Sequence, residues 1–259
     1  MRSEEEYRRA VQLIDAGIND CEIGRRLGIP RGTIRDWRVG VASGSGGRTK
    51  FSSRKQIVTC FRCTRGWVDE EAYAYLLGAY LGDGCLTPLP RDVYRLRVFC
   101  DLRYPEIIDE ISSCIVLVRG TERVGYVAGK GCVEVYSFWK HWLCLFPQHG
   151  PGRKHHRRIE LAPWQRQIVV AHPKDLVRGL IHSDGNRHVN VITRKVSAGP
   201  KRYRYPRYQF SNASTDIRTI FTDALDLLGV HWTRNTARDI SVARQQDVAF
   251  LDTFIGPKH

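Results

Sequence analysis

The sequence lacks the features that mark a secreted, membrane-bound or disulfide-stabilised protein. No apolar run approaches the length of about 20 residues that a membrane span needs, and the charged start Arg2-Ser3-Glu4-Glu5-Glu6 differs from a signal peptide. The eight cysteines are scattered, mostly inside apolar stretches, which is typical of reduced thiols. We therefore expect a cytoplasmic protein with no membrane partner.

Acidic residues are scarce relative to basic ones. The chain has 27 Asp and Glu against 41 Lys and Arg, which gives a formal net charge of +14. A charge of this size favours a polyanionic partner. A membrane surface is also polyanionic, but the sequence has no basic helix with a clear apolar face to lie on one. Nucleic acid is the better interpretation, and a DNA-bound protein would be associated with the nucleoid.

One pair of cysteines has a spacing that zinc sites use. Cys60 and Cys63 are separated by two residues, as in half of a zinc knuckle. Zinc takes four ligands, however, and no second pair with matching spacing follows in the sequence. Cys85 or a histidine brought close by the fold would be needed to complete a zinc site. We therefore interpret Cys60 and Cys63 as buried thiols.

Two segments of the chain repeat one pattern. Tyr75–Gly84 and Leu176–Gly185 are each apolar on nearly every side, which predicts two helices that are buried all round. Each segment carries two small residues four positions apart, where the backbones of two helices can approach closely. These helix-interface residues are Gly78, Gly82, Gly179 and Ser183.

An acidic residue stands at the end of each of these helices, Asp83 in the first and Asp184 in the second. A helix C-terminus carries a partial negative charge, so a carboxylate is electrostatically unfavourable there. Two such carboxylates brought together repel unless a divalent cation lies between or beside them. Either segment alone is explained by an ordinary helix end, since Gly commonly follows one. The repetition in similar surroundings favours a metal site on a duplicated scaffold.

The nine-residue segments Leu76–Gly84 and Val177–Gly185 resemble the motif of the LAGLIDADG family of homing endonucleases and their regulator relatives. The resemblance implies an α+β fold of two tandem αββαββα repeats, related by a pseudo-twofold axis, that form a saddle straddling double-stranded DNA. It also implies a monomer, because both motif copies lie in one chain.

The resemblance further implies which residues carry the chemistry. The first acidic position of the motif is Leu81 in one copy and His182 in the other. The metal-binding acid of the family is the second one, so Asp83 and Asp184 are the expected ligands of Mg²⁺ or Mn²⁺ and the expected catalytic acids. A family lysine near the scissile phosphates matches Lys154, which would stabilise charge on the phosphate or order the attacking water. A basic linker that only touches DNA explains the surroundings of Lys154 equally well.

Residues 1–41 are predicted to form a small all-α domain. Helical periodicity, a turn at Gly28 and Pro30 at the start of the next helix resemble the helix-turn-helix of resolvases and invertases, whose last helix enters the major groove. Ile34 and Trp37 would pack inward. The alternative is any three-helix bundle with a basic face. The residues expected to face DNA are Arg31, Thr33, Arg35 and Arg38.

The remaining organisation follows from composition and periodicity. A Gly- and Ser-rich stretch begins a flexible basic linker over 42–58. We expect the first repeat over 59–150, a basic inter-repeat linker over 151–174 and the second repeat over 175–259. Within the repeats we expect loops over 85–93 and 195–207 and a helix over 138–145.

Polar residues that contact DNA are expected on one face of the predicted strands. Arg95 and Arg97 share a face opposite Leu96 and Val98, and the second repeat alternates in the same way. Arg, Gln and Asn read base edges through paired hydrogen bonds. A solvated outer face of a sheet gives the same pattern. The predicted DNA-binding residues are Arg95, Arg97, Asn190, Arg194, Lys201, Arg202, Arg204, Arg207 and Gln209.

The sequence thus predicts a site-specific, metal-dependent endonuclease for double-stranded DNA. A transcriptional regulator that uses the same scaffold and no longer cuts is the alternative, and the presence of both acids favours the nuclease. An RNA-splicing maturase is a third reading, which the DNA-type helix-turn-helix disfavours. No splicing-junction residue occurs at Met1 or His259, so we expect a free-standing protein rather than an intein.

Overall fold

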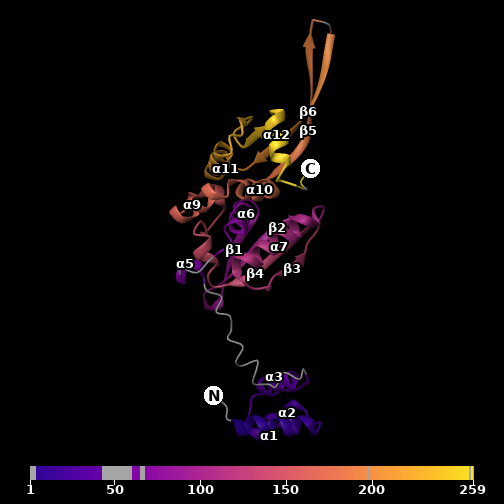
Figure 1. The fold of residues 1–259 in the computed structure, drawn as a ribbon, viewed down its shortest axis with the longest axis vertical. Coiled ribbons are helices and arrows are strands. Elements are labelled where there is room, and N and C mark those ends of the chain that lie inside the picture. Colours follow the sequence, from indigo (N-terminus) through magenta and orange to yellow (C-terminus); the bar gives the residue numbers. More distant parts are fainter. Residues whose placement is uncertain (1–3, 43–59, 65–67, 198, 257, 259) are drawn as a thin grey trace. The chain divides into compact units, whose positions relative to one another are not determined.

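The structure is a computed structural model that describes residues 4–42, 60–64, 68–197, 199–256 and 258. The chain divides into two compact units, Met1–Val58 and Thr59–His259 (Figure 1). The linker predicted over 42–58 lies, apart from its first residue, outside the described residues. Among the residues that are described, no helix is long and apolar enough to cross a membrane.

The first unit consists of three helices. These are α1 (Glu4–Asp15), α2 (Asp20–Leu27) and α3 (Arg31–Ala42). The Asn19 side chain caps α2 by accepting a hydrogen bond from the Glu22 backbone N–H at 3.0 Å. Gly28 ends α2 in the left-handed conformation, with φ of 64°. Ile34 and Trp37 are buried against α1 and α2, as their spacing on α3 predicts.

The second unit has an α+β fold made of two copies of one element order. A short helix, α5 (Phe61–Thr64), precedes the first copy. The first copy contains α6 (Glu70–Leu81), β1 (Gly84–Leu89), the 3₁₀ turn η1 (Pro90–Asp92), β2 (Val93–Asp101), α7 (Pro105–Arg119), β3 (Gly125–Ala128), β4 (Cys132–Trp139) and α8 (Trp142–Leu145). The second copy contains α10 (Pro173–Asp184), β5 (Gly185–Val196), β6 (Gly199–Ser211), α11 (Thr215–Leu227), β7 (Thr233–Arg234), β8 (Asp239–Val242) and α12 (Gln245–Asp252).

Each copy builds one antiparallel four-stranded sheet, and the strand order is the same in both. The orders are β1-β2-β4-β3 and β5-β6-β8-β7. The registers also correspond, because Gly84 pairs with Val98 in the first sheet and Gly185 pairs with Phe210 in the second. Two αββαββα repeats with pseudo-twofold symmetry therefore form the second unit.

Four elements differ from the sequence predictions. Residues 84–89 form β1, where we expected a loop, and the first repeat's last helix begins at Trp142 because β4 continues through Trp139. A helix, α9 (Pro163–Ala171), occupies the predicted inter-repeat linker and buries Ile168 and Val169, after the 3₁₀ turn η2 (Lys154–His156).

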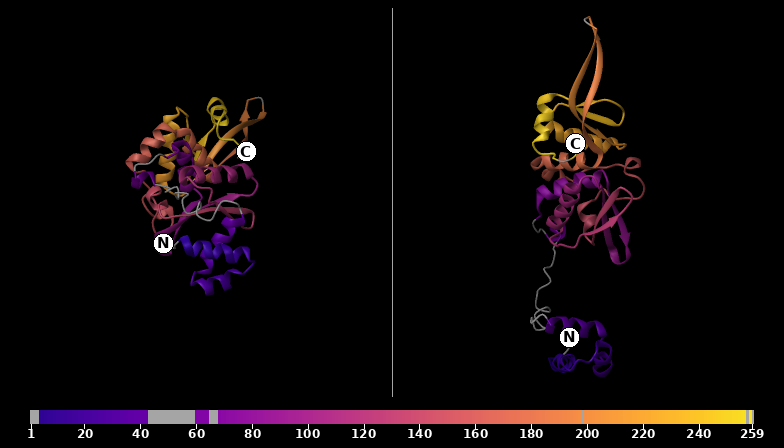
Figure 2. Two further views of the ribbon diagram at one scale, coloured as in Figure 1. Left: turned by 60° about the horizontal axis from the view of Figure 1, so that its bottom comes forward. Right: turned by 90° about the vertical axis from the view of Figure 1, so that its right-hand side faces the viewer.

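The fourth difference is the segment 195–207, which is mostly strand and not loop. It extends β6, which pairs with β5 from Gly199 to Phe210. The two strands form a ribbon that projects from the rest of the unit (Figures 1 and 2). Pro200 and Pro206 misled the prediction, since proline is rare inside sheets. Both stand in the part of β6 that has only β5 as a partner, because β8 pairs with β6 only from Tyr208 to Ser211.

The core of the second unit is the contact between α6 and α10. Every residue of α6 from Ala72 to Leu81 is buried. A Cβ atom on Gly78 would lie 2.6 Å from the Leu176 carbonyl oxygen, and one on Gly179 would lie 2.1 Å from the Tyr75 carbonyl oxygen. The two helix backbones therefore touch directly, and only residues without a side chain fit at the crossing.

We expect Gly179→Ala to lower the free energy of unfolding of the second unit by roughly 2–3 kcal/mol, because the new methyl group meets backbone atoms that cannot yield. Urea denaturation followed by circular dichroism measures this. The control is Gly32→Ala in α3, a helical glycine with no atom within 4 Å of the added Cβ. That change should be neutral or stabilising in its own unit. Unfolding of Gly179→Ala at the parental urea concentration would contradict the close contact.

Candidate functional site

Asp83 and Asp184 stand at equivalent places in the two repeats. Asp83 follows the end of α6 and Asp184 is the last residue of α10, and these helices lie side by side in the second unit (Figure 1). Both side chains line one open cleft with a volume of about 670 Å³. Lys154 and Asn212 line the same cleft. The structure thus brings together the three residues for which the sequence predicts a catalytic role.

The two carboxyl groups influence each other's protonation. The pKa of Asp184 is raised to about 6, mainly by burial and next by the negative charge of Asp83. Burial also raises the pKa of Asp83, against the opposing effect of the Lys258 and Lys154 charges. Two partly desolvated acids that repel each other are the condition under which a bound cation is favourable.

A lysine is placed at the C-terminal end of each motif helix. The Lys154 ammonium donates to the carbonyl oxygens of Tyr80, Leu81 and Gly82, the last two at 3.0 and 2.9 Å. These carbonyls form the negative end of the α6 dipole, so a cation is favourable there. Burial lowers the pKa of Lys154 to about 8, while the charges of Asp184, Cys85 and Asp83 oppose the shift.

Lys258 binds the carbonyl oxygens at the end of α10, as Lys154 binds those at the end of α6. Its ammonium donates to the carbonyl oxygens of His182 and Ser183 at 2.8 and 2.5 Å. Burial lowers its pKa, and Asp83 and Asp184 oppose the shift. Sequence reasoning missed Lys258. The duplication offers a signal for it, since a lysine after the last helix of the first repeat suggests one after the last helix of the second.

The two acids have different neighbours on their sheets. Since Val98 and Phe210 occupy equivalent register positions, Cys100 is the counterpart of Asn212. The Asn212 amide donates to Asp184 Oδ2 at 2.5 Å. A Cys100 thiol near Asp83 is a much weaker donor; its pKa is raised to about 12, mainly by burial and next by the Asp83 charge. The two halves of the site are therefore chemically unequal.

The residues at this site fit a hard divalent cation. They offer carboxylate oxygens from the ends of two helices, on the wall of an open cleft. Mg²⁺ binds through one or two carboxylates and keeps several of its waters. Asp83 and Asp184 are the groups that would hold such an ion.

His182, the residue two positions before Asp184, makes structural contacts. Its Nε2 lies 2.6 Å from the Ile255 carbonyl oxygen and its Nδ1 lies 2.8 Å from the Tyr75 hydroxyl. A carbonyl only accepts, so Nε2 carries the proton and Nδ1 accepts from the Tyr75 hydroxyl. Burial lowers the pKa of His182 to about 4, so the ring is neutral at physiological pH. It links α10 to α6 and to the segment after α12.

The predicted DNA-binding residues of the first sheet are partly neutralised. Arg95 and Arg97 both form ion pairs with Glu134 on β4, the latter at 2.7 Å. In the second sheet, the Asn190 amide donates to the Tyr205 hydroxyl at 2.6 Å, and Arg207 donates to the same hydroxyl at 3.2 Å.

The other predicted contacts of the second sheet are more open. Gln209 is half-buried and contributes to the hydrogen bonds around Asp239. The remaining predicted cations project from the β5–β6 ribbon into solvent. They are Arg194, Lys201, Arg202 and Arg204.

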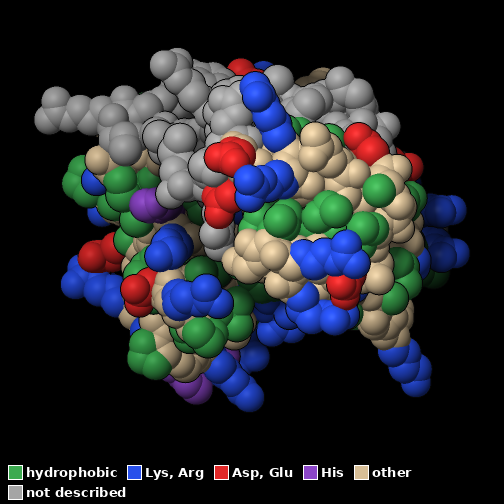
Figure 3. Space-filling model, turned by 90° about the horizontal axis from the view of Figure 1, so that it is seen from below, with side chains coloured by type: hydrophobic (Ala, Val, Ile, Leu, Met, Phe, Trp, Pro, Cys, Tyr) green, Lys and Arg blue, Asp and Glu red, His purple; other side chains and the backbone are tan. Residues whose placement is uncertain are grey.

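The predicted DNA contacts on α3 differ in their exposure to solvent. Arg31 and Arg35 are exposed and Thr33 is half-buried. Arg38 is half-buried and bound within its own unit, because its Nε donates to Asp20 at 2.7 Å and its Nη2 donates to the Ile18 carbonyl. Arg38 therefore ties α3 to the start of α2. Lysine and arginine side chains, drawn in blue, are spread over the face shown in Figure 3, among fewer acidic ones.

The chain is similar to several solved structures. It resembles the homing endonuclease I-DmoI in complex with DNA and Mn, with 16% identity, a TM-score of 0.47, and coverage of 73% of this chain and 98% of that one. It also resembles the LAGLIDADG meganuclease I-AabMI bound to uncleaved DNA, at 12% identity and a TM-score of 0.44, covering 70% of this chain and 82% of that one. No protein-family model and no curated protein matches the sequence. The identities are low and both TM-scores are below 0.5, so we base the function proposed below on this chain's own residues.

We expect Asp184→Asn to stabilise the second unit at neutral pH in the absence of divalent metal. The folded-state pKa of about 6 exceeds the ordinary 3.8, so ionised Asp184 costs stability above about pH 6 and costs nothing below about pH 4. The gain should be roughly 1–3 kcal/mol near pH 7.5 and should vanish near pH 4. Urea denaturation in EDTA across this range measures it.

The matched control is Asp109→Asn, which changes an exposed carboxyl group on α7. This control should follow the parental curve of stability against pH. If Asp184→Asn is no more stable than the parent at neutral pH, the raised pKa of Asp184 is refuted.

Proposed function

We propose that this chain is a LAGLIDADG-type endonuclease that hydrolyses both strands of double-stranded DNA with Mg²⁺ or Mn²⁺. The observation that supports this most strongly is the pair of acids, Asp83 and Asp184, that share one cleft at the ends of two touching helices. A structural helix end has no need for a second acid at the equivalent place. Localisation to the cytoplasm or nucleoid and a monomeric state are part of the proposal.

Asp83 and Asp184 would hold the cation, which supplies a water of lowered pKa and stabilises the leaving oxygen. The chain's own residues do the rest. Asn212 orients the Asp184 carboxylate through its hydrogen bond to Oδ2. Lys154 and Lys258 place positive charge beside the two acids, where charge develops on a phosphate. Both lysines are held by the helix carbonyls, so their positions are fixed before DNA binds.

DNA binding would use two surfaces of the chain. The ribbon cations Arg194, Lys201, Arg202 and Arg204 are exposed and form no ion pair with a described carboxylate, so they are available to phosphates. Arg31 and Arg35 of α3 are exposed on the first unit and would contact DNA as in a helix-turn-helix. Arg95 and Arg97 both pair with Glu134, which holds their guanidinium groups in fixed orientations for DNA contact.

Cleavage of a randomised plasmid library in Mg²⁺ tests the proposal. The parent should linearise some members, whereas Asp83→Asn and Asp184→Asn should reduce cleavage by at least about 100-fold, because each removes a group that acts on the transition state. Both variants should still bind DNA, since loss of a carboxylate reduces repulsion toward phosphate. The control Asp109→Asn should cut like the parent.

If the parent binds DNA but cuts nothing in Mg²⁺ or Mn²⁺, the nuclease is refuted. Under that result the chain is a regulator on the same scaffold. A variant that folds normally but loses affinity would contradict the role given to the acids.

The ribbon prediction concerns salt dependence. Replacing Lys201, Arg202 and Arg204 with alanine should reduce the slope of log K against log salt by roughly 2–3, because about one counterion is released per phosphate contact. Fluorescence anisotropy on one duplex at several salt concentrations gives the slope. A triple control removes three exposed cations elsewhere in the second unit and should change the slope much less. These are Arg158, Arg166 and Lys174. Equal effects of the two triple variants would show that the ribbon makes no special contact.

A further inference from the structure

The fold brings a second pair of ligands to Cys60 and Cys63, which the sequence alone did not supply. His141 and Cys144 lie beside them, and the four potential ligand atoms all lie within 4.8 Å of one another. The prediction of two buried thiols is right for Cys60 and wrong for Cys63, which is exposed. The missing pair escaped notice because it begins with a histidine and stands about 80 residues farther along the chain.

The distances among three members of this group match the edges of a tetrahedral metal site. Cys63 Sγ lies 3.7 Å from Cys144 Sγ and 3.5 Å from His141 Nδ1, and Cys144 Sγ lies 3.8 Å from His141 Nδ1. A tetrahedron with Zn–S bonds of about 2.3 Å and Zn–N bonds of about 2.0 Å has edges of roughly 3.5–3.8 Å. The ligand atoms of Cys63, His141 and Cys144 are thus already at the separations that one zinc ion imposes, and the Cys60 sulfur lies within 4.8 Å of each of them.

The two pairs are presented by similar short turns. Cys60 and Cys63 flank the start of α5, where the Cys63 N–H donates to the Cys60 carbonyl at 2.9 Å. His141 and Cys144 flank the start of α8, where the Cys144 N–H donates to the His141 carbonyl at 3.0 Å. Two residues separate the members of each pair, which is the spacing at which one turn can direct two side chains to one ion.

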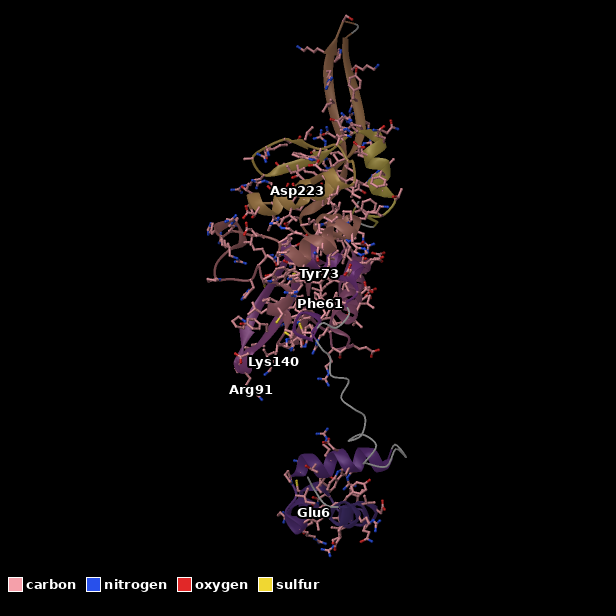
Figure 4. All side chains as sticks on the ribbon, turned by 60° about the vertical axis from the view of Figure 1, so that its left-hand side comes forward. Glu6, Phe61, Tyr73, Arg91, Lys140 and Asp223 are labelled. Atoms are coloured by element: carbon pink, nitrogen blue, oxygen red, sulfur yellow. The ribbon has the colours of Figure 1, made fainter. Side chains whose placement is uncertain are left out.

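Packing around the group holds α5 in place. Phe61, between the two cysteines, contacts Tyr73 on α6 and Trp164 on α9, with ring centroids 6.4 and 5.1 Å apart. Figure 4 labels Phe61 and Tyr73, and yellow sulfur atoms lie close to the Phe61 label. The Tyr73 hydroxyl also donates to the Leu145 carbonyl on α8 at 2.5 Å. Both turns therefore rest on α6, which carries Asp83 at its far end.

From this geometry we propose that Cys60, Cys63, His141 and Cys144 bind one Zn²⁺ as a structural site. Four protein ligands close the coordination sphere, which is typical of structural and not catalytic zinc. The three thiols bind as thiolates, so three protons leave when zinc enters at a pH where the thiols are protonated. None of the four residues lines the cleft of Asp83 and Asp184, so this site is separate from the proposed nuclease centre.

A disulfide is the main competing use of these thiols. A bond between Cys63 and Cys144 requires sulfur atoms about 2.05 Å apart, and theirs are 3.7 Å apart. A disulfide would also not explain why Cys60 and His141 lie beside the other two residues. Zinc accounts for all four residues and for the matched spacing of the two pairs.

The zinc ion would fasten α5, near the start of the second unit, to α8, the last helix of the first repeat. Its binding free energy adds to the stability of this part of the fold. Because α8 and α6 share the Tyr73–Leu145 hydrogen bond, loosening α8 would loosen the support of α6.

Metal content of the purified full chain tests the proposal. After dialysis against metal-free buffer, elemental analysis should find about one zinc per chain. Cys144→Ser and Cys63→Ser should bind zinc more than about 100-fold more weakly, since loss of an outer-shell partner alone costs roughly 10–100-fold. The control Cys132→Ser changes a half-buried cysteine outside the group and should keep the zinc.

A second measurement uses Co²⁺ on the parent and does not depend on whether the variants fold. Cobalt-loaded protein should show the intense visible bands of tetrahedral Co²⁺ and a thiolate-to-cobalt charge-transfer band, and added Zn²⁺ should remove both. No zinc uptake, weak bands of octahedral Co²⁺, iron as the only bound metal, or a mass showing a Cys63–Cys144 disulfide in the protein as purified would each overturn the proposal. None of these results depends on whether the protein cleaves DNA.

Discussion

The second unit depends on the direct contact between the backbones of α6 and α10. Gly78 and Gly179 permit that contact, since a side chain at either position would collide with backbone atoms of the other helix. The contact brings the two helix ends together and with them Asp83 and Asp184, whose mutual repulsion would otherwise separate the groups. Lys154 and Lys258 offset this repulsion and complete the negative helix ends. Packing at the crossing thus makes an electrostatically unfavourable arrangement stable.

Most of the fold and part of the site could be predicted from the sequence, because these depend on local pattern. The motif helices and the three helices of the first unit follow from periodicity, and the repetition predicts that Asp83 and Asp184 come together. The resemblance to the LAGLIDADG family implies the two αββαββα repeats. The extended β5–β6 ribbon could not, because pairing with β5 overrides the local preference of Pro206. The start of α8 could not, because it is set by the pairing of β4 with β2 through Trp139. The local pattern also gave no sign of contacts between residues far apart in the chain. Lys258 near the two acids and the pair His141 and Cys144 near Cys60 are examples.

The two repeats share one strand order, but the residues around their acids differ. Leu81 is buried where His182 makes two hydrogen bonds, and Cys100 stands where Asn212 orients an acid. Such replacements keep the common backbone while they alter the polarity around each carboxylate. The cysteine and histidine group at α5 and α8 has no counterpart in the second repeat among the described residues, so the proposed zinc site would stabilise the first repeat alone.

The difference between Asn212 and Cys100 also bears on how the proposed nuclease would lie on DNA. An assembly of two identical subunits is symmetric, so it recognises palindromes and has no preferred direction along them. A single chain whose halves differ carries a built-in polarity. Its target can be an asymmetric sequence, on which the Asp184 half always faces the same strand.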